Sequence, residues 1–155
     1  MAVSAQPSPR GRAIAPHRTI VVPVTGSSGR AVAAAASLAA RDGAAIHLLH
    51  VLEVPRELPL DAHFPDEEHA AWTLLRNAQA LVESYGAGAV VSLERARSAA
   101  DAVVARADML DADLLVVGVR GPAAGRHSLL GRTAAAILHH AECRVMVVRE
   151  RQSAR

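Results

Sequence analysis

The chain has 155 residues, about the length of one domain, and 51% of them are apolar, which is enough for an aliphatic core. Its 17 basic residues, all arginine, face 15 acidic residues, so the net charge is only +2. This balance excludes the basic footprint of a typical nucleic-acid-binding protein, and one residue each of Phe, Trp and Tyr excludes an aromatic stacking platform. The single cysteine excludes an internal disulfide and favours a reducing compartment.

The ends of the chain differ in composition from its middle. No apolar run approaches the roughly 20 residues of a membrane span, and residues 1–18 carry Pro, Arg and polar residues where a signal peptide needs an apolar segment. We therefore expect a cytoplasmic protein with no membrane partner. Residues 1–18 are expected to form a flexible tail, residues 19–149 the folded domain, and residues 150–155 a short second tail.

Between the tails, short β-branched runs alternate with stretches of helical periodicity. Strands are expected over residues 19–24, 45–51, 87–94, 114–118 and 143–149, and helices over residues 30–41, 66–85, 98–110 and 132–141. Strands that alternate with helices are joined by crossover connections. The pattern therefore predicts an α/β fold in which helices cover both faces of a five-stranded parallel sheet, a doubly wound three-layer sandwich.

A sheet of this kind binds ligands beyond the carboxyl ends of its strands, where the winding direction reverses. The loops to consider are residues 25–29, after the first strand, and residues 119–131, after the fourth. In the first loop, Ser27 and Ser28 are expected to cap the following helix, because Gly-Ser-Ser-Gly lacks the spacing of a nucleophile elbow.

The second loop combines three features of a phosphate site. Gly118, Gly121 and Gly131 allow close approach of an anion to the backbone, the helix that starts after Gly131 offers unpaired N–H groups, and three arginines add positive charge. The alternative is that Gly118 and Gly121 only allow a tight exit from the strand, with the arginines solvated.

The spacing Gly118-x2-Gly121-x9-Gly131 resembles the ATP loop of the universal stress protein family, and it lies between the same two elements. Three further stretches are similar to that family: VVPVTGS at residues 21–27, LLHV at residues 48–51, and the last helix and strand up to residue 148. The resemblance implies a flavodoxin-like domain with strand order 3-2-1-4-5 and a homodimer in which the last strands of two subunits pair.

The edge position of the last strand, Cys143 to Arg149, favours the same homodimer, because an exposed apolar edge is normally paired or protected. The resemblance also implies that an adenine nucleotide, ATP or AMP, lies across the strand ends, with no metal other than a nucleotide-bound Mg²⁺. The candidate ligand-binding residues are Val24, Thr25, Ser27, Val51, Gly118, Val119, Arg120, Gly121, Gly131, Arg132 and Thr133.

Two positions depart from the family pattern. Thr25 stands where nucleotide-binding members usually carry an acidic residue, and a threonine hydroxyl binds ribose hydroxyls less strongly than a carboxylate does. Arg132 stands where those members carry Ser or Thr, one residue before Thr133. Its guanidinium either holds a phosphate in its fork or occupies the phosphate position and excludes the ligand.

Two main hypotheses of function follow. The first is a nucleotide-binding homodimer that acts in stress-response signalling, with at most slow ATP hydrolysis, since no catalytic base is visible. The second is a dimeric interaction module of the same fold that no longer binds nucleotide and docks to an unknown protein partner. A small redox or hydrolytic enzyme is a third reading, which lacks a recognisable catalytic set.

The remaining candidate residues favour structural roles. His63 with His69, and His139 with His140, lack the spacing of metal ligands. Cys143 opens an apolar strand and is expected to pack there as a small hydrophobic residue. No metal site is therefore predicted.

Overall fold

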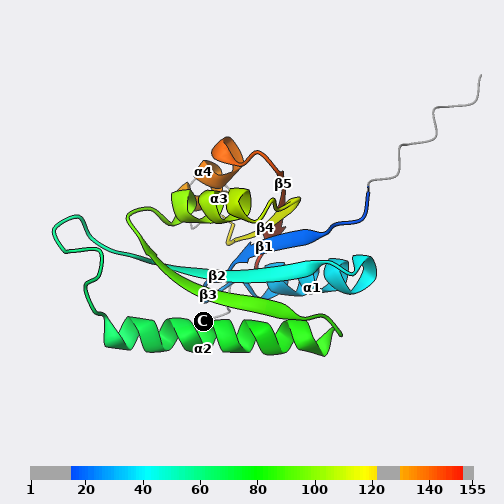
Figure 1. Ribbon diagram of the computed structural model, residues 1–155, viewed down its shortest axis with the longest axis horizontal. Coiled ribbons are helices and arrows are strands. Elements are labelled where there is room, and N and C mark those ends of the chain that lie inside the picture. Colours follow the sequence, from blue (N-terminus) through cyan, green and yellow to red (C-terminus); the bar gives the residue numbers. More distant parts are fainter. Residues whose placement is uncertain (1–14, 122–129, 152–155) are drawn as a thin grey trace, which may run out of the picture.

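A computed structural model describes residues 15–121 and 130–151 (Figure 1). The elements are β1 (Thr19–Pro23), α1 (Gly29–Asp42), β2 (Ala45–Glu53), α2 (Pro65–Ser84), β3 (Ala89–Ala96), α3 (Ala99–Met109), β4 (Leu114–Val119), α4 (Arg132–His140) and β5 (Arg144–Arg149). The strands form one parallel sheet in the order β3-β2-β1-β4-β5. The predicted fold class and strand order are therefore confirmed, with element ends that differ from the predicted ones by at most two residues.

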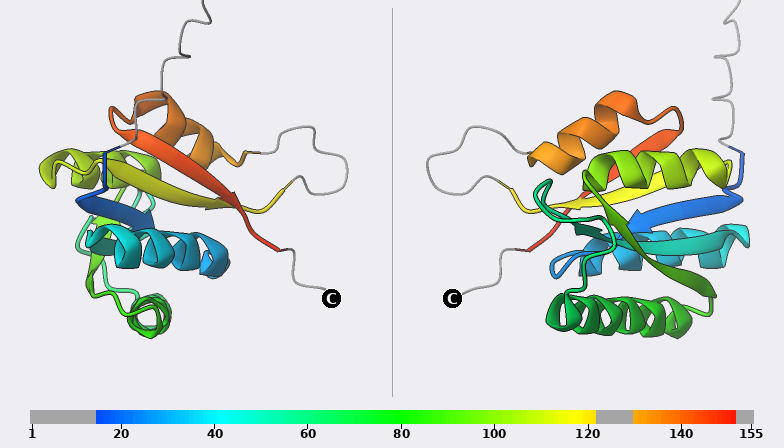
Figure 2. Two further views of the ribbon diagram at one scale, coloured as in Figure 1. Left: turned by 90° about the vertical axis from the view of Figure 1, so that its right-hand side faces the viewer. Right: turned by 60° about the vertical axis from the view of Figure 1, so that its left-hand side comes forward.

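Helices cover both faces of the sheet, as Figures 1 and 2 show. One apolar cluster joins the sheet to α1 and α2, and a second joins it to α3 and α4. The strands supply both clusters because successive side chains point to opposite faces. Ile20 and Val22 belong to the first cluster and Val21 to the second, and all three are fully buried.

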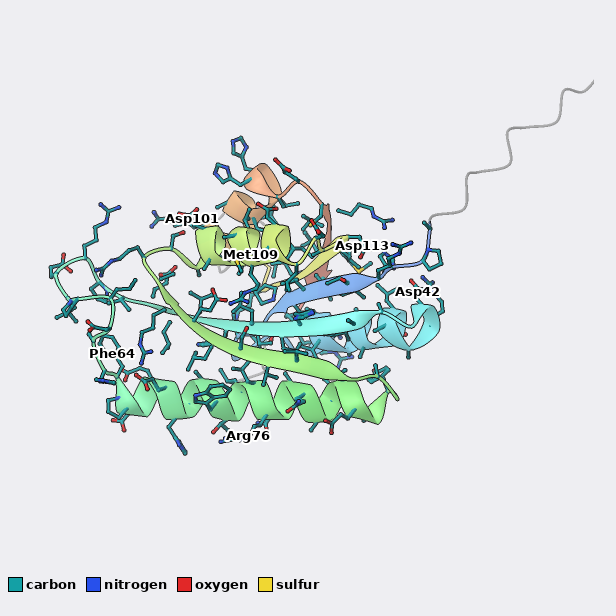
Figure 3. The ribbon with its side chains drawn as sticks, in the orientation of Figure 1. Asp42, Phe64, Arg76, Asp101, Met109 and Asp113 are labelled. Atoms are coloured by element: carbon teal, nitrogen blue, oxygen red, sulfur yellow. The ribbon has the colours of Figure 1, made fainter. Side chains whose placement is uncertain are left out.

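Helix α2 shows how the sequence period sets the packing. Its stripe of Ala71, Leu75, Ala78 and Val82 is buried against the sheet, as the predicted spacing requires. In Figure 3, Arg76 of the same helix points away from the sheet. Although α2 has 20 residues, no helix in the described part of the chain is long and apolar enough to cross a membrane.

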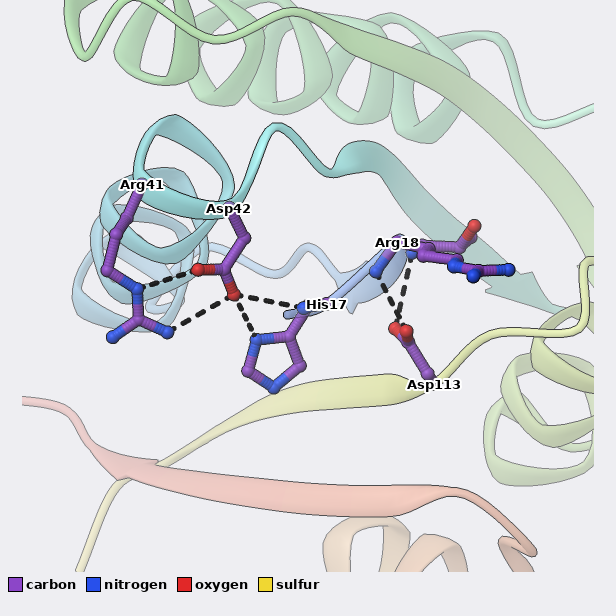
Figure 4. Close-up of polar contacts among 6 residues, drawn as sticks. His17, Arg18, Arg41, Asp42 and Asp113 are labelled. Atoms are coloured by element: carbon purple, nitrogen blue, oxygen red, sulfur yellow. Dashed lines mark hydrogen bonds and ion pairs between the residues drawn. The ribbon is translucent and has the colours of Figure 1, made fainter. Parts of the chain in front are cut away.

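The folded part begins before the predicted boundary at residue 19. His17 is 8% exposed, its backbone N–H donates to Asp42 Oδ2 (N···O 3.0 Å), and its Nδ1 donates to the same oxygen (2.7 Å). The backbone N–H groups of Arg18 and Thr19 donate to Asp113 (2.8 and 3.2 Å). These carboxylates flank the start of β1 (Figures 3 and 4), so the last two residues of the predicted tail are anchored. Residues 1–14 of that tail lie outside the described part.

The folded part also ends after the predicted boundary at residue 149. Glu150 is 7% exposed, and its backbone N–H donates to the carbonyl of Val119 (2.7 Å), which extends the pairing of β5 with β4. The sequence analysis assigned Glu150 to the tail, since a single charged residue after a strand has no periodic signal. Residues 152–155 lie outside the described part.

Candidate functional site

The winding direction of the sheet reverses between β1 and β4, and the candidate site lies beyond their carboxyl ends. The β1–α1 turn there is held by Ser28, whose Oγ accepts a hydrogen bond from the Thr25 N–H (3.0 Å) and donates one to the Thr25 carbonyl (3.0 Å). Ser28 precedes α1, yet its side chain makes no capping hydrogen bond to the helix. Ser28 therefore occupies the predicted N-cap position, and its carbonyl accepts from the Val32 N–H (2.9 Å), but its side chain caps the turn rather than the helix.

Ser27 does not cap α1 either. Its hydroxyl accepts a hydrogen bond from Arg120 Nε (2.7 Å), so it joins the β1–α1 turn to the residue that follows β4. The prediction that Ser27 caps the helix is therefore wrong. The two loops that the sequence analysis singled out meet at this contact.

The amino terminus of α1 is capped by Glu150, from the other end of the chain. One carboxylate oxygen accepts from the Arg30 N–H (3.0 Å) and the other from the Ala31 N–H (2.8 Å). The carboxylate thus satisfies two free amides of the first turn and lies at the positive end of the helix dipole. Sequence reasoning missed Glu150, because a contact across about 120 positions leaves no local pattern.

Two of the three loop glycines have structural roles in this arrangement. A Cβ atom at Gly118 would lie 2.9 Å from Glu150 Oε1, so glycine leaves room for the buried carboxylate. Gly121 has a positive φ of 36°, and a Cβ there would lie 3.1 Å from Arg149 Nη2. These contacts favour the alternative in which both glycines serve the exit from the strand.

Gly131 is different. It precedes α4 with an extended backbone (φ −68°, ψ 169°), and a Cβ there would meet no atom of the described residues within 4 Å. Within the described residues, no side chain makes a capping hydrogen bond at the start of α4, and both Arg132 and Thr133 are exposed. Among the described residues, the first amides of α4 thus have no side-chain acceptor, whereas those of α1 have Glu150. Residues 122–129 of the predicted loop lie outside the described part.

The candidate residues on the strands divide between the two faces of the sheet. Val51 and Val119 pack in the cluster below α3 and α4, whereas Val24 belongs to the cluster below α1 and α2. Val24 is 3% exposed, and its carbonyl accepts a hydrogen bond from His50 Nδ1 (2.7 Å). Thr25 is exposed beside them. Val51 and Val119 are therefore the apolar candidates on the same face as α4.

The geometry gives little support for other chemistry at the described residues. They include no group of three or more His, Cys, Asp or Glu side chains that could hold a metal ion. The rings of His139 and His140 lie edge to face, with centroids 4.8 Å apart. Cys143 is half-buried, and burial raises the pKa of its thiol, which disfavours the reactive thiolate.

The parallel strand order, with its reversal between β1 and β4, defines a single-domain, doubly wound α/β protein. A model of the universal stress protein family matches residues 16–149, and this chain belongs to that family. The family predicted from the loop spacing is therefore confirmed.

Relatives cover almost the whole folded part. Universal stress protein G of Escherichia coli O157:H7 is 35% identical over 143 residues, which cover 86% of this chain and 99% of the relative. A universal stress protein solved in complex with cAMP has a TM-score of 0.70 and 27% identity, over 86% of this chain and 97% of that one. The universal stress protein from Archaeoglobus fulgidus in complex with dAMP has a TM-score of 0.68 and 22% identity, over 85% and 98%.

Proposed function

We propose that this protein binds an adenine nucleotide, ATP or AMP, at the carboxyl edge of the sheet, with the phosphates on the amino terminus of α4. The observation that carries the proposal is the contrast between two helix starts on the same edge. The start of α1 is capped by Glu150, whereas the start of α4 has no side-chain cap among the described residues and open space at Gly131. A phosphate supplies the missing acceptors.

The other candidate residues suit the rest of a nucleotide. Val51 and Val119 offer apolar surface on the α4 side for the base, and the hydroxyls of Thr25 and Ser27 serve the ribose. Arg132 is exposed on the first turn of α4, where its guanidinium holds the phosphate. The relatives solved with cAMP and dAMP support a ligand of this class.

We further propose that nucleotide occupancy is a signal in a stress response rather than the start of a reaction. No arrangement of a nucleophile with a general base was recognised in the sequence, so ATP hydrolysis is expected to be slow, with Mg²⁺ present only as the nucleotide's own ion. The cytoplasm is the proposed compartment, since a single cysteine suits reducing conditions.

The test is ligand release followed by thermal shift. Small molecules freed by heat denaturation of the fresh protein are identified by mass spectrometry, and melting is then followed with ATP, AMP and cyclic AMP. A ligand that binds only the native state raises the melting temperature. We expect a bound or stabilising adenine nucleotide. No released nucleotide and no shift at millimolar concentration would leave the dimeric interaction module, for which the structural roles of Gly118 and Gly121 already argue.

Gly131→Val locates the phosphates. A Cβ at this position would meet no atom of the described residues within 4 Å and needs no positive φ, so the variant should fold normally and yet fill the space where a phosphate would approach. We expect its nucleotide affinity to fall at least about tenfold, the loss of one charge-assisted hydrogen bond. Gly88→Val, in equally open space before β3, is the matched control. Equal affinity of the two variants contradicts the proposed phosphate position.

A further inference from the structure

The face of the sheet below α3 and α4 is open to solvent at the amino end of the edge strand β3. Val21, His47 and Val90 form one row across β1, β2 and β3 in the strand register. Val21 belongs to the cluster below α3 and α4, so His47 and Val90 lie on that same face. Exposure rises along the row, from 0% at Val21 through the half-buried His47 to 59% at Val90. The described helices therefore shield this row at β1 and leave it exposed at β3.

Met109, the last residue of α3, adds a second exposed apolar side chain beside this row. It follows Arg106 by three positions, so the two side chains lie on one side of the helix. Arg106 pairs with Glu94 of β3, and burial followed by the nearby charge of Arg106 lowers the pKa of His47. This side of α3 therefore faces β2 and β3, and in Figure 3 Met109 lies on α3 above β2. Met109 is 75% exposed, and among the described residues it and Val90 are the most exposed large apolar side chains.

The end of α3 that carries Met109 is acidic. Asp108 and Asp111 are exposed, and neither forms an ion pair with a residue in the ranges 15–121 and 130–151. The carboxyl terminus of a helix also carries the negative end of the helix dipole. Exposed apolar surface therefore lies next to negative charge that no described residue balances. We name Val90, Asp108, Met109 and Asp111 the amino-edge patch.

The amino-terminal segment of the chain, residues 1–14, joins the described part close to the amino-edge patch. The backbone N–H of Arg18 donates to Asp113 (2.8 Å), which follows Asp111 by two positions. Val90 lies two strands away from β1, about 10 Å at the usual spacing of strands. Fourteen residues span up to about 46 Å when fully extended. Residues 1–14 are therefore long enough to reach every part of the patch.

The composition of residues 1–14 complements the amino-edge patch. The segment carries two arginines and the terminal amino group but no acidic residue, and its large apolar side chains are Met1, Val3 and Ile14. Guanidinium groups pair with the exposed aspartates of the patch, and apolar side chains cover its valine and methionine. Because the segment is tethered beside the patch, its effective concentration there is high, and weak contacts suffice for binding.

We infer that the amino-edge patch is the docking site of residues 1–14 of the same chain. The docked segment covers the exposed end of the row at Val90 and the side chain of Met109, and it brings its arginines to Asp108 and Asp111. The patch lies at the amino ends of the strands, whereas the proposed nucleotide site lies at their carboxyl ends. The inference therefore stands apart from the proposed function.

Limited digestion of the full chain with trypsin tests the docking. Trypsin cuts after Arg10 and Arg12, and a docked segment is cut only in the fraction of time that it is released. Mass spectrometry follows both cuts, with a synthetic peptide of residues 1–16 as the unprotected reference. We expect the wild type to be cut at least about tenfold more slowly than the peptide, and Met109→Ser to regain about tenfold, since it loses the burial of one large apolar side chain.

Matched variants separate docking from general loosening of the fold. Leu138→Ser makes a similar change on α4, at a side chain that is 40% exposed, and should be cut like the wild type. Asp111→Asn keeps the positive φ of 48° that asparagine tolerates, removes one charge of the patch and should speed cleavage, whereas Asp61→Asn should not. Melting curves check that each variant folds.

Three results overturn the inference. In the first, the wild type is cut as fast as the peptide, which leaves the amino-edge patch to a separate protein. In the second, Met109→Ser and Leu138→Ser are cut at equal rates, which places the protection elsewhere. In the third, protection disappears on tenfold dilution, as it would if the segment of a second copy occupied the patch. Protection that dilution leaves unchanged and that Met109→Ser removes supports docking within one chain.

Discussion

Glu150 and Gly118 form a pair in which the position of one residue limits the identity of the other. The carboxylate of Glu150 reaches the α1 amides by passing through the space that a side chain at position 118 would take. A glycine in a phosphate-loop spacing is usually explained by its ligand. Here the packing inside the protein is already a sufficient reason for it.

A double-mutant cycle tests this pair. Gly118→Ala should lower the free energy of unfolding by about 1–3 kcal/mol, the usual range for overpacking, because its Cβ would lie 2.9 Å from Glu150 Oε1. Glu150→Ala should lower it by about 0.5–2 kcal/mol, as the loss of a helix cap does. The double variant should be more stable than the sum of the two losses predicts, since removing the carboxylate removes the clash. Urea denaturation gives the free energy of unfolding of the wild type, the two single variants and the double variant.

Simple additivity in that cycle would contradict the proposed contact. Gly131→Ala and Glu142→Gln are matched controls, because position 131 is open and Glu142 is exposed. Both should stay within about 0.5 kcal/mol of the wild type, as surface substitutions usually do.

At the scale of elements, the segment before β1 is held by carboxylates from two loops. Asp42 ends α1 and Asp113 precedes β4, and together they accept the backbone N–H groups of His17, Arg18 and Thr19 (Figure 4). The neighbouring strands begin level with Thr19, at Ala45 of β2, and level with Ile20, at Leu114 of β4, so His17 and Arg18 lie before both of them. The two aspartates therefore hold the backbone in place at the start of β1 and in the two residues before it.

The pH dependence of stability reports on Asp42. Hydrogen bonds from the Arg41 guanidinium, and then from the backbone and ring of His17, hold the pKa of Asp42 far below its usual range. A carboxyl group whose pKa is lowered by folding stabilises the native state above its unfolded pKa of about 3.9, and that contribution disappears as pH falls towards the folded pKa. Between about pH 5 and pH 3, the stability of the wild type should therefore decline more steeply than that of Asp42→Asn.

Urea midpoints measured across this pH range give the comparison. The two proteins should differ most above pH 5 and converge in acid. Asp61→Asn, in the exposed part of the β2–α2 loop, should follow the wild-type curve. Parallel curves for Asp42→Asn and the wild type would show that the contacts of Asp42 with His17 and Arg41 contribute nothing to the loss of stability in acid.

Features that depend on residues close together in the sequence were predicted well, whereas features that depend on residues far apart were not. Hydrophobic periodicity is local, and it located every strand and helix, including the buried stripe of α2. The strand order came from the resemblance, because periodicity does not show which strands are neighbours. For the site, the sequence indicated the correct edge of the sheet but assigned Gly118 to a ligand and Glu150 to a tail. Contacts between residues about 120 apart leave no such pattern.

At the scale of the whole molecule, the two edges of the sheet differ. The edge strand β3 carries Glu94 and Arg95, each in an ion pair with a helix residue, and charged residues discourage pairing with another chain. The edge strand β5 instead carries the apolar run Val145 to Val148 between its two arginines. We propose that two copies pair through β5, as the sequence analysis expected.

Light scattering after gel filtration tests the dimer. Val147 is 38% exposed on β5, and Val147→Asp would bury an unpaired charge in the joined sheet, so we expect a dimeric wild type and a monomeric variant. Val90→Asp, on β3 at 59% exposure, makes the same change at the other edge and should remain dimeric. A monomeric wild type, or loss of the dimer in Val90→Asp alone, contradicts pairing through β5.

The cap that Glu150 places on α1 sets a limit on where the protein can be shortened. The family match ends at residue 149, and a fragment cut there would keep every strand and helix. It would nevertheless leave two amides of the first turn of α1 without their acceptor and put a new carboxyl terminus at the last residue of β5. A fusion partner or affinity tag should therefore be joined after Glu150, because the domain defined by energetics is longer than the domain defined by similarity.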